Sequence, residues 1–257
     1  MVILHVKCGD ESQFLYNTSV NIDIDTLTNE VVAIYNGRLK IGRICMAIEQ
    51  LAEHGTMLPP NMAGLNEEQV KELKLKDEWG EICEPMGGFT HNPDIYFNRN
   101  GKQPSESMQN VLKKTIEDAK AMVSKKKVGA NVVLTQKDVF DAISMLRGAV
   151  TIVYPMNLPP HDTIRLEFEN NEHLEGTQAS LEVVDPILAQ LWFSGKEMFR
   201  DKKLKDFVGS NEKTKIVVKL TCAGRCPPGR EPVFTEEEKK EMMLHAYRRQ
   251  EDLKVCD

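Results

Sequence analysis

The stretch LRGAVTIVYPMNLPPHDTIRLEFEN, residues 146–170, holds the local pattern on which the fold prediction depends. Within it, an apolar and β-branched run over residues 149–154 stops abruptly at Pro155, and a Pro159-Pro160 corner follows. Such a run is too short for a helix that must bury itself, and it suits a strand packed on both faces. We therefore predict an internal strand from Ala149 to Tyr154.

Two further runs of the same kind lie near the two ends of the chain, Val2–Val6 and Ile216–Leu220. Because such runs need neighbouring strands, we expect segments more than a hundred residues apart to share one sheet. Gly9-Asp10 favours a turn between the first run and Phe14–Tyr16. The chain is therefore expected to begin with a β-hairpin.

A helix is predicted directly after this hairpin, with apolar residues at helical spacing from Leu27 to Tyr35. Thr26 or Thr28 can cap its start, and Asn36-Gly37 is a typical stop. A hairpin followed by a helix is how a ubiquitin-like β-grasp begins. We predict an α+β fold with a ubiquitin-like β-grasp core whose third strand, residues 149–154, follows a large helical insertion, and with additional C-terminal helices.

The remaining periodic segments are predicted to be helices, and most have recognisable caps or stops. They are Leu39–His54 ended by Gly55, residues 67–79 capped by Asn66, Pro104–Lys127, a short helix capped by Thr135, a helix starting at Asp185-Pro186, and Thr235–Leu253. Residues 84–105 are dense in Pro, Gly and Asn without any period, which predicts a flexible loop.

Three regions follow from these elements. Residues 1–55 are expected to supply the N-terminal hairpin and helices of the β-grasp-like core. Residues 56–147 are expected to form the helical insertion with its loop at 84–105. Residues 148–257 are expected to complete the sheet and to form the C-terminal helical region.

Composition indicates an ordinary soluble protein of 257 residues, with 41% apolar residues and a net charge of −6 at pH 7. No global positive field would attract nucleic acid or an anionic membrane. No window approaches the roughly 18 apolar residues of a membrane span, and the N-terminus up to Lys7 is too short for a signal sequence. We therefore predict a cytoplasmic protein whose six cysteines are reduced.

The sequence shows no complete catalytic, cofactor-binding or metal-binding motif. Cys222 and Cys226 supply two zinc ligands, but a closed site requires four and no second pair is present. The segment GSNEKTK at 209–215 is the nearest approach to a phosphate-binding turn, yet it lacks the second Gly and precedes a predicted strand. We predict no cofactor and no metal, and we expect the protein not to be an enzyme.

Basic clusters beside acidic residues, such as Lys213 with Lys215 and Arg248-Arg249, are expected to be solvated helix ends or turns. The functional alternative is a local anionic partner, such as an acidic protein segment or a tubulin surface. The C-terminal helix carries Met242 and Met243. It either docks internally, which we favour, or offers an adaptable apolar face to another protein.

The 146–170 stretch also resembles the Kurly family of cilia- and flagella-associated proteins, and the likeness recurs along the chain. The matching segments are IYNGRLK (34–40), LAEHGTMLPPNMAGL (51–65), KELKLKDEWGE (71–81), VLKKTIEDAKA (111–121), GTQAS (176–180), AQLW (189–192), VGSNEKTKI (208–216), REP (230–232) and YRRQEDLK (247–254). The segments 17–25, 84–100 and 221–229 depart from the family pattern, and all three are predicted loops.

The resemblance implies a non-enzymatic protein required for motile cilia, for assembly of axonemal outer dynein arms and for planar polarity of cilia, located in the cytoplasm and at the basal body. The implied partners are dynein assembly factors and chaperones, or axonemal proteins. The alternative function is a structural component of the axoneme or basal body. A third hypothesis, an enzyme built on the β-grasp, requires a deep pocket lined by polar groups with perturbed pKa values.

Contact residues for a protein partner are predicted from charge combined with placement at a turn or a helix end. They are Asn211, Glu212, Lys213, Lys215, Arg230, Glu231, Pro232, Arg248 and Arg249. Charge reversal at Lys213 and Arg249 together is expected to abolish capture of the partner while the melting temperature stays within a few degrees.

Overall fold

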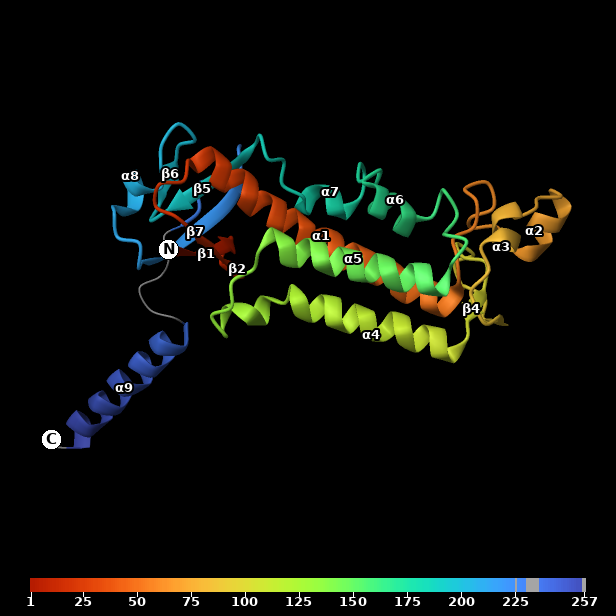
Figure 1. Cartoon of the computed structure of the whole chain (residues 1–257). Coiled ribbons are helices and arrows are strands. Elements are labelled where there is room, and N and C mark those ends of the chain that lie inside the picture. Colours follow the sequence, from red (N-terminus) through yellow and green to blue (C-terminus); the bar gives the residue numbers. More distant parts are fainter. Residues whose placement is uncertain (225, 230–235, 256–257) are drawn as a thin grey trace.

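The computed structural model describes residues 1–224, 226–229 and 236–255. Figure 1 shows a β-sheet at one end, long helices that extend from it, and a smaller lobe at their far end. The sheet has five strands, namely β1 (Val2–Cys8), β2 (Glu11–Thr18), β5 (Ala189–Phe193), β6 (Lys196–Met198) and β7 (Lys215–Cys222). Their order across the sheet is β2-β1-β7-β5-β6.

The sheet joins the two ends of the chain, as the sequence predicts. β1 pairs antiparallel with β2 and parallel with β7, so that Val6 lies opposite Val218. β5 then pairs antiparallel with β7 on one side and with β6 on the other. The predicted N-terminal hairpin and the strand at 216–220 are therefore confirmed.

One face of the sheet packs on the long helix α1 (Ile24–His54). Side chains of β1 and β7 alternate between the two faces, and Leu4, Val6 and Val218 are fully buried on the inner one. They join Leu27 and Val31 of α1 in the hydrophobic core. This packing turns the opposite, outer face of the sheet away from α1.

α1 is one continuous helix of 31 residues, about 46 Å long at 1.5 Å per residue. The predicted stop at Asn36-Gly37 is wrong, because both residues lie inside α1 and contact other segments of the fold. The Asn36 amide donates to the carbonyl of Val184 at 2.8 Å and accepts from its N–H at 3.0 Å. Gly37 lies against Val139 so closely that a Cβ there would be 2.5 Å from its Cγ1.

The ends of α1 differ in how well the sequence predicts them. Its N-cap is Asp23, and Thr28 lies inside the helix, where its hydroxyl donates to the carbonyl of Ile24 at 2.7 Å. The predicted Thr26 or Thr28 cap is therefore wrong. The C-terminal stop at Gly55 is confirmed, since Gly55 has a φ of 78° and its N–H donates to Leu51.

Residues 149–154 do not form a strand. Residues 149–153 are the last turns of α5 (Gln136–Val153), and Tyr154 is its C-cap. The predicted cap at Thr135 is confirmed, and it is part of a capping box: the Thr135 hydroxyl accepts from the Asp138 N–H at 3.2 Å, and the Asp138 carboxylate accepts from the Thr135 N–H at 2.8 Å. The buried residues of α5 recur at helical spacing, namely Val139, Ala142, Leu146, Ala149, Val150 and Val153. Packing of this stripe outweighs the weak β preference of its last residues.

α5 packs on α1 together with α4 (Glu106–Met122), which is followed by a short 3-10 turn, η1 (Lys125–Val128). The helix predicted from Pro104 to Lys127 is thus confirmed, apart from its last residues. Gly37 of α1 allows α5 to approach closely. These three helices form the layer that carries the lobe away from the sheet (Figure 1).

The lobe contains short elements. They are α2 (Glu67–Glu72), α3 (Glu78–Ile82), β3 (Phe89–His91) and β4 (Lys102–Pro104). Two further short helices, α6 (Thr163–Glu169) and α7 (Gln178–Glu182), lie beside α1 between the lobe and the sheet (Figure 1). The predicted cap at Asn66 is confirmed, and it forms a capping box with Gln69, but the single helix predicted over 67–79 is wrong. It breaks at Lys74, whose φ of 53° lies in the left-handed region. The loop at 84–105 contains the β3–β4 hairpin.

The third strand of the sheet is β5, and it begins 40 residues later than predicted. The segment between α1 and β5 is therefore longer than expected, from residue 55 to 188. Asp185-Pro186 starts no helix: Asp185 accepts from the Ile187 N–H at 2.8 Å in the turn that leads into β5. Pro186 has no N–H, which suits a position just outside a strand.

After β6 the chain passes through α8 (Lys205–Val208) into β7, and the last described helix is α9 (Glu236–Val255). Figure 1 shows α9 standing away from the sheet. Met243 is 73% exposed and Tyr247 is 61% exposed. Internal docking of this helix is therefore wrong for its described side chains, residues 240–249. The predicted cap at Thr235 lies outside the described residues.

Candidate partner-binding surface

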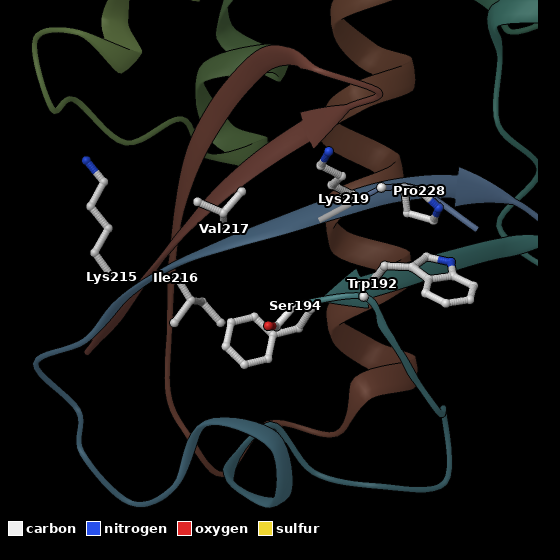
Figure 2. A pocket seen from close by; sticks show the side chains of 10 residues that line it. Trp192, Ser194, Lys215, Ile216, Val217, Lys219 and Pro228 are labelled. Carbon is white, nitrogen blue, oxygen red and sulfur yellow. The ribbon is translucent and has the colours of Figure 1, made fainter. Parts of the chain in front are cut away.

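The outer face of the sheet is the surface that the long helix leaves uncovered. It is formed by the residues of each strand that alternate with the core residues, among them Val217 and Lys219 of β7 and Trp192 of β5. The register places Trp192 directly opposite Lys219. The two side chains leave neighbouring strands at paired positions, and the Lys219 ammonium points away from the indole ring (Figure 2).

A pocket of about 370 Å³ opens at the edge of this face, where outer-face residues meet Phe193 and Ile216, which pack with the core. Its walls come from β5, β7, the turn between β5 and β6, and the chain that follows β7. The lining residues are Trp192, Phe193, Ser194, Gly195, Lys215, Ile216, Val217, Lys219, Pro228 and Gly229. Segments far apart in the sequence thus meet in one hollow.

The turn at the edge of the pocket is a two-residue hairpin. Ser194 and Gly195 both have positive φ, 51° and 76°, and they connect the pair Phe193 and Lys196. Positive φ at both turn positions is typical of a type I′ turn, which matches the twist of the two strands. The turn therefore holds Trp192 and Phe193 in a defined position.

The cationic groups of the pocket have different partners. Lys219 is 7% exposed at its side chain, and its Nζ donates to the Asp10 carboxylate at 3.0 Å. That hydrogen bond and the charge of Lys219 lower the pKa of Asp10 below its ordinary value. Lys215 is exposed, and its Nζ donates to the neutral amide oxygen of Asn131 at 2.9 Å. This amide carries no charge that would neutralise Lys215.

Trp192 adds a further hydrogen-bond donor to this site. Its indole Nε1 is buried and has no acceptor among the described residues. A buried N–H without an acceptor costs free energy, about 1–3 kcal/mol for a typical polar group. The polar side chains of the pocket are thus mainly donors, and no Asp or Glu is among its described lining residues.

The structure places the predicted contact residues in three different settings. Asn211, Glu212 and Lys213 are exposed in the turn that precedes β7, where the Asn211 side chain accepts from the Lys213 N–H at 3.0 Å. Glu212 lies 3.6 Å from the N-terminal ammonium. Lys215 is part of the pocket itself.

The other predicted contact residues are not among the described residues that line the pocket. Arg230, Glu231 and Pro232 lie outside the described residues and follow Gly229 in the sequence. Arg248 and Arg249 lie on α9 and are both exposed. The structure thus joins one of the predicted residues, Lys215, to a defined hollow.

Sequence reasoning missed Trp192, Lys219 and the Ser194-Gly195 turn. A usable indication was present, because Ser-Gly between LWF and KEM is a two-residue hairpin pattern. The pairing of Trp192 with Lys219 could not be predicted from the sequence, since it depends on the register of β5 on β7, which local sequence does not determine.

A larger groove of about 720 Å³ lies beside α1 and α6. Its charges are compensated within the protein. Arg43 contacts both carboxylate oxygens of Glu167 at 2.5 and 3.0 Å, and Lys40 lies 2.9 Å from Glu172. These pairs bind α6 and the turn after it to α1, so a structural role accounts for them.

The described residues contain no group of three or more His, Cys, Asp or Glu side chains arranged to hold a metal ion. Cys222 is half-buried and Cys226 is exposed, and both are free thiols. Among the described helices, none has the length and apolar composition required to cross a membrane.

Comparison with known proteins matches the chain to one family. The profile of the family described as cilia- and flagella-associated protein 298 matches residues 189–257. A protein of that name from Drosophila melanogaster is 57% identical over 257 residues, which is 100% of this chain and 88% of the relative. The protein of that name from Homo sapiens is 56% identical over 235 residues, 91% of this chain and 81% of the relative. No solved structure matches the chain.

Proposed function

The chain belongs to the cilia- and flagella-associated protein 298 family, also called Kurly, and on this premise we propose that it acts without catalysis in the assembly of axonemal outer dynein arms. The membership implies a role in cilia. We propose further that the protein is required for movement and planar polarity of cilia, and that it works through protein–protein contacts.

The observation that carries the proposal is the extent of the similarity. Identity of 57% spans the whole chain rather than one motif, and relatives from insect and vertebrate share the same name. The family name describes a cilium-associated protein and no enzyme class. A non-enzymatic role agrees with this name.

The fold supports a role in binding. We infer that the sheet is a ubiquitin-like β-grasp, because a hairpin, a helix and a second hairpin precede a last strand that pairs parallel with the first. In such a sheet one face is covered by the helix and the other is available for a partner. The pocket beside Trp192 lies at the edge of the available face.

We place the protein in the cytoplasm, at the basal body and in the cilium, with dynein assembly factors and chaperones as partners. The second candidate function is a structural component of the axoneme or basal body. The family name favours it equally, since "cilia- and flagella-associated" describes a location. The two functions differ in where the protein stays after the cilium is built.

Proximity labelling of the tagged protein in ciliating cells distinguishes the two functions. The cells are separated into cytoplasm and salt-washed, demembranated axonemes. An assembly factor enriches dynein heavy chains and chaperones in the cytoplasm, and its depletion removes dynein arms. Enrichment of doublet-microtubule proteins in the axonemal fraction, with dynein arms intact after depletion, would contradict the assembly function and support the structural one.

A further inference from the structure

We propose that the pocket at the edge of the outer face of the sheet binds an acidic peptide segment of a partner protein, with a carboxylate at Lys215 and an apolar side chain against Trp192. The inference deepens the proposed function, because it names the surface and the chemistry through which a protein partner is held.

The size of the pocket fits part of a peptide. Its volume of about 370 Å³ falls at the lower end of the range for ligand sites, roughly 300–1,000 Å³. Pro228 adds apolar surface near the Trp192 ring, and Val217 lies farther along β7 (Figure 2). An apolar side chain of about three to six carbon atoms beyond Cβ, such as Leu or Phe, would remove this surface from water.

The charge of the pocket determines which residues of a bound peptide are favoured next to that apolar side chain. The described lining holds two ammonium groups, and the Lys215 ammonium is exposed beside a neutral amide. Lys219 is already paired with Asp10. A carboxylate of a bound peptide would therefore find its main ionic partner at Lys215, where the charge is neither buried nor neutralised by the bond to Asn131.

The same region gives a reason why a peptide is favoured over nucleic acid. The chain as a whole carries a net charge of −6, which repels a polyanion. A short acidic segment experiences mainly the local positive charge, since fields from distant groups are screened beyond about 8 Å at physiological salt.

Intrinsic fluorescence of Trp192 measures binding directly. The chain has two tryptophans, Trp79 and Trp192, so Trp79→Phe leaves Trp192 as the only indole reporter. The probes are three end-capped decapeptides: one in which Glu alternates with Leu and Phe, a twin with Gln in place of every Glu, and a twin with Ser in place of every Leu and Phe. Each is titrated to about 1 mM at 50 mM and 300 mM salt.

We expect the Glu/Leu/Phe peptide to change the Trp192 emission with a dissociation constant at least tenfold lower than those of both twins. Raising the salt concentration should weaken it, because an exposed ion pair is screened. Lys215→Glu should weaken it by about tenfold or more, which corresponds to about 1.4 kcal/mol. The matched control, Lys113→Glu, reverses an exposed charge on α4 and should leave the affinity unchanged.

Several results would overturn the proposal. They are equal affinity for the Glu and Gln peptides, no emission change up to 1 mM, or equal weakening by Lys215→Glu and Lys113→Glu. Stronger binding of a single-stranded oligonucleotide would assign the face to nucleic acid. A shift of Trp192 emission in the free protein caused by Met243→Ser would assign it to the chain's own α9.

The failure of this inference can be distinguished from failure of the proposed function. In ciliating cells, Lys215→Glu should reduce labelling of partners while the thermal melting temperature of the purified variant stays within about 2 °C of the parent. Full partner labelling and normal motility with Lys215→Glu would remove the pocket from the mechanism and leave the ciliary function standing.

Discussion

Substituting Gly37 by Ala tests whether the close approach of α1 and α5 is needed for the fold. In an ordinary helix interior, Gly→Ala stabilises by about 1 kcal/mol. Here the added Cβ would lie 2.5 Å from Cγ1 of Val139, far inside van der Waals contact. Val is stiff at χ1 and cannot easily turn its methyl away. Overpacking of a core costs about 1–3 kcal/mol, so the net effect is a loss of about 1 kcal/mol.

Gly42→Ala is the matched control, because Gly42 lies in the same helix and a Cβ there would meet no atom within 4 Å. It should raise the free energy of unfolding by about 1 kcal/mol. For a chain of this size, each kcal/mol moves the melting temperature by about 2–4 °C. Thermal unfolding followed by circular dichroism should therefore show opposite shifts for Gly37→Ala and Gly42→Ala.

Removing the obstructing methyls supplies the decisive comparison. Val139→Ala alone should cost about 2 kcal/mol, from two buried methyl groups and the space they leave. In that background Gly37→Ala should become stabilising, which gives a coupling free energy of about 1–3 kcal/mol between the two sites. If Gly37→Ala raises the melting temperature in the parent chain, or if the two effects simply add, close helix packing at Gly37 is refuted.

Three further outcomes follow from local contacts. Glu172→Gln should lower the melting temperature at pH 7, and the difference should shrink as the pH falls. Burial alone would raise the pKa of Glu172, but hydrogen bonding and cationic neighbours such as Lys40 outweigh it, so the stability present above the ordinary value of 4.5 is lost as pH falls through the lowered pKa. A constant difference across a pH series would contradict this. Thr135→Ala should cost about 1 kcal/mol, visible as a lower urea midpoint, because the α5 cap is lost; an unchanged midpoint would argue against the cap. Burial raises the pKa of the Cys45 thiol to about 11. Iodoacetamide at pH 8 should therefore alkylate exposed Cys226 well before Cys45, as followed by mass spectrometry. Equal alkylation rates of the two thiols would contradict this.

The hairpin and the strand at β7 could be predicted because their information is local. Gly9 supplies a positive φ of 62° at the turn, and an apolar run lies on each side of that turn in the sequence. Residues 149–154 misled because β-branched residues also suit the last turns of a helix that is held by a strong cap and a buried stripe. In that segment the tertiary contacts, and not the intrinsic preference, decided the structure.

The helix stop predicted at Asn36-Gly37 was wrong for a related reason. Both residues are common at helix ends, but here each one meets a segment more than a hundred residues away, Asn36 at Val184 and Gly37 at Val139. A small residue and an amide are also what a crowded contact between packed elements requires. One chain segment cannot show which of these uses applies, because the partner lies elsewhere in the sequence.

The residues of the candidate site also differ in whether local sequence predicts them. Lys215 was predictable because charge next to a strand start is visible locally, whereas Trp192 and Lys219 meet only through the register of β5 on β7. The α1 helix covers the inner face of this sheet and then carries the inserted residues 55–188 away from it (Figure 1). The lobe and the long helices of the insertion therefore lie away from the pocket, and the insertion reaches it at Asn131, which accepts from the Lys215 Nζ. A partner could engage that face without displacing the lobe, which is why substitutions at Gly37 and at Lys215 should act on stability and on binding independently.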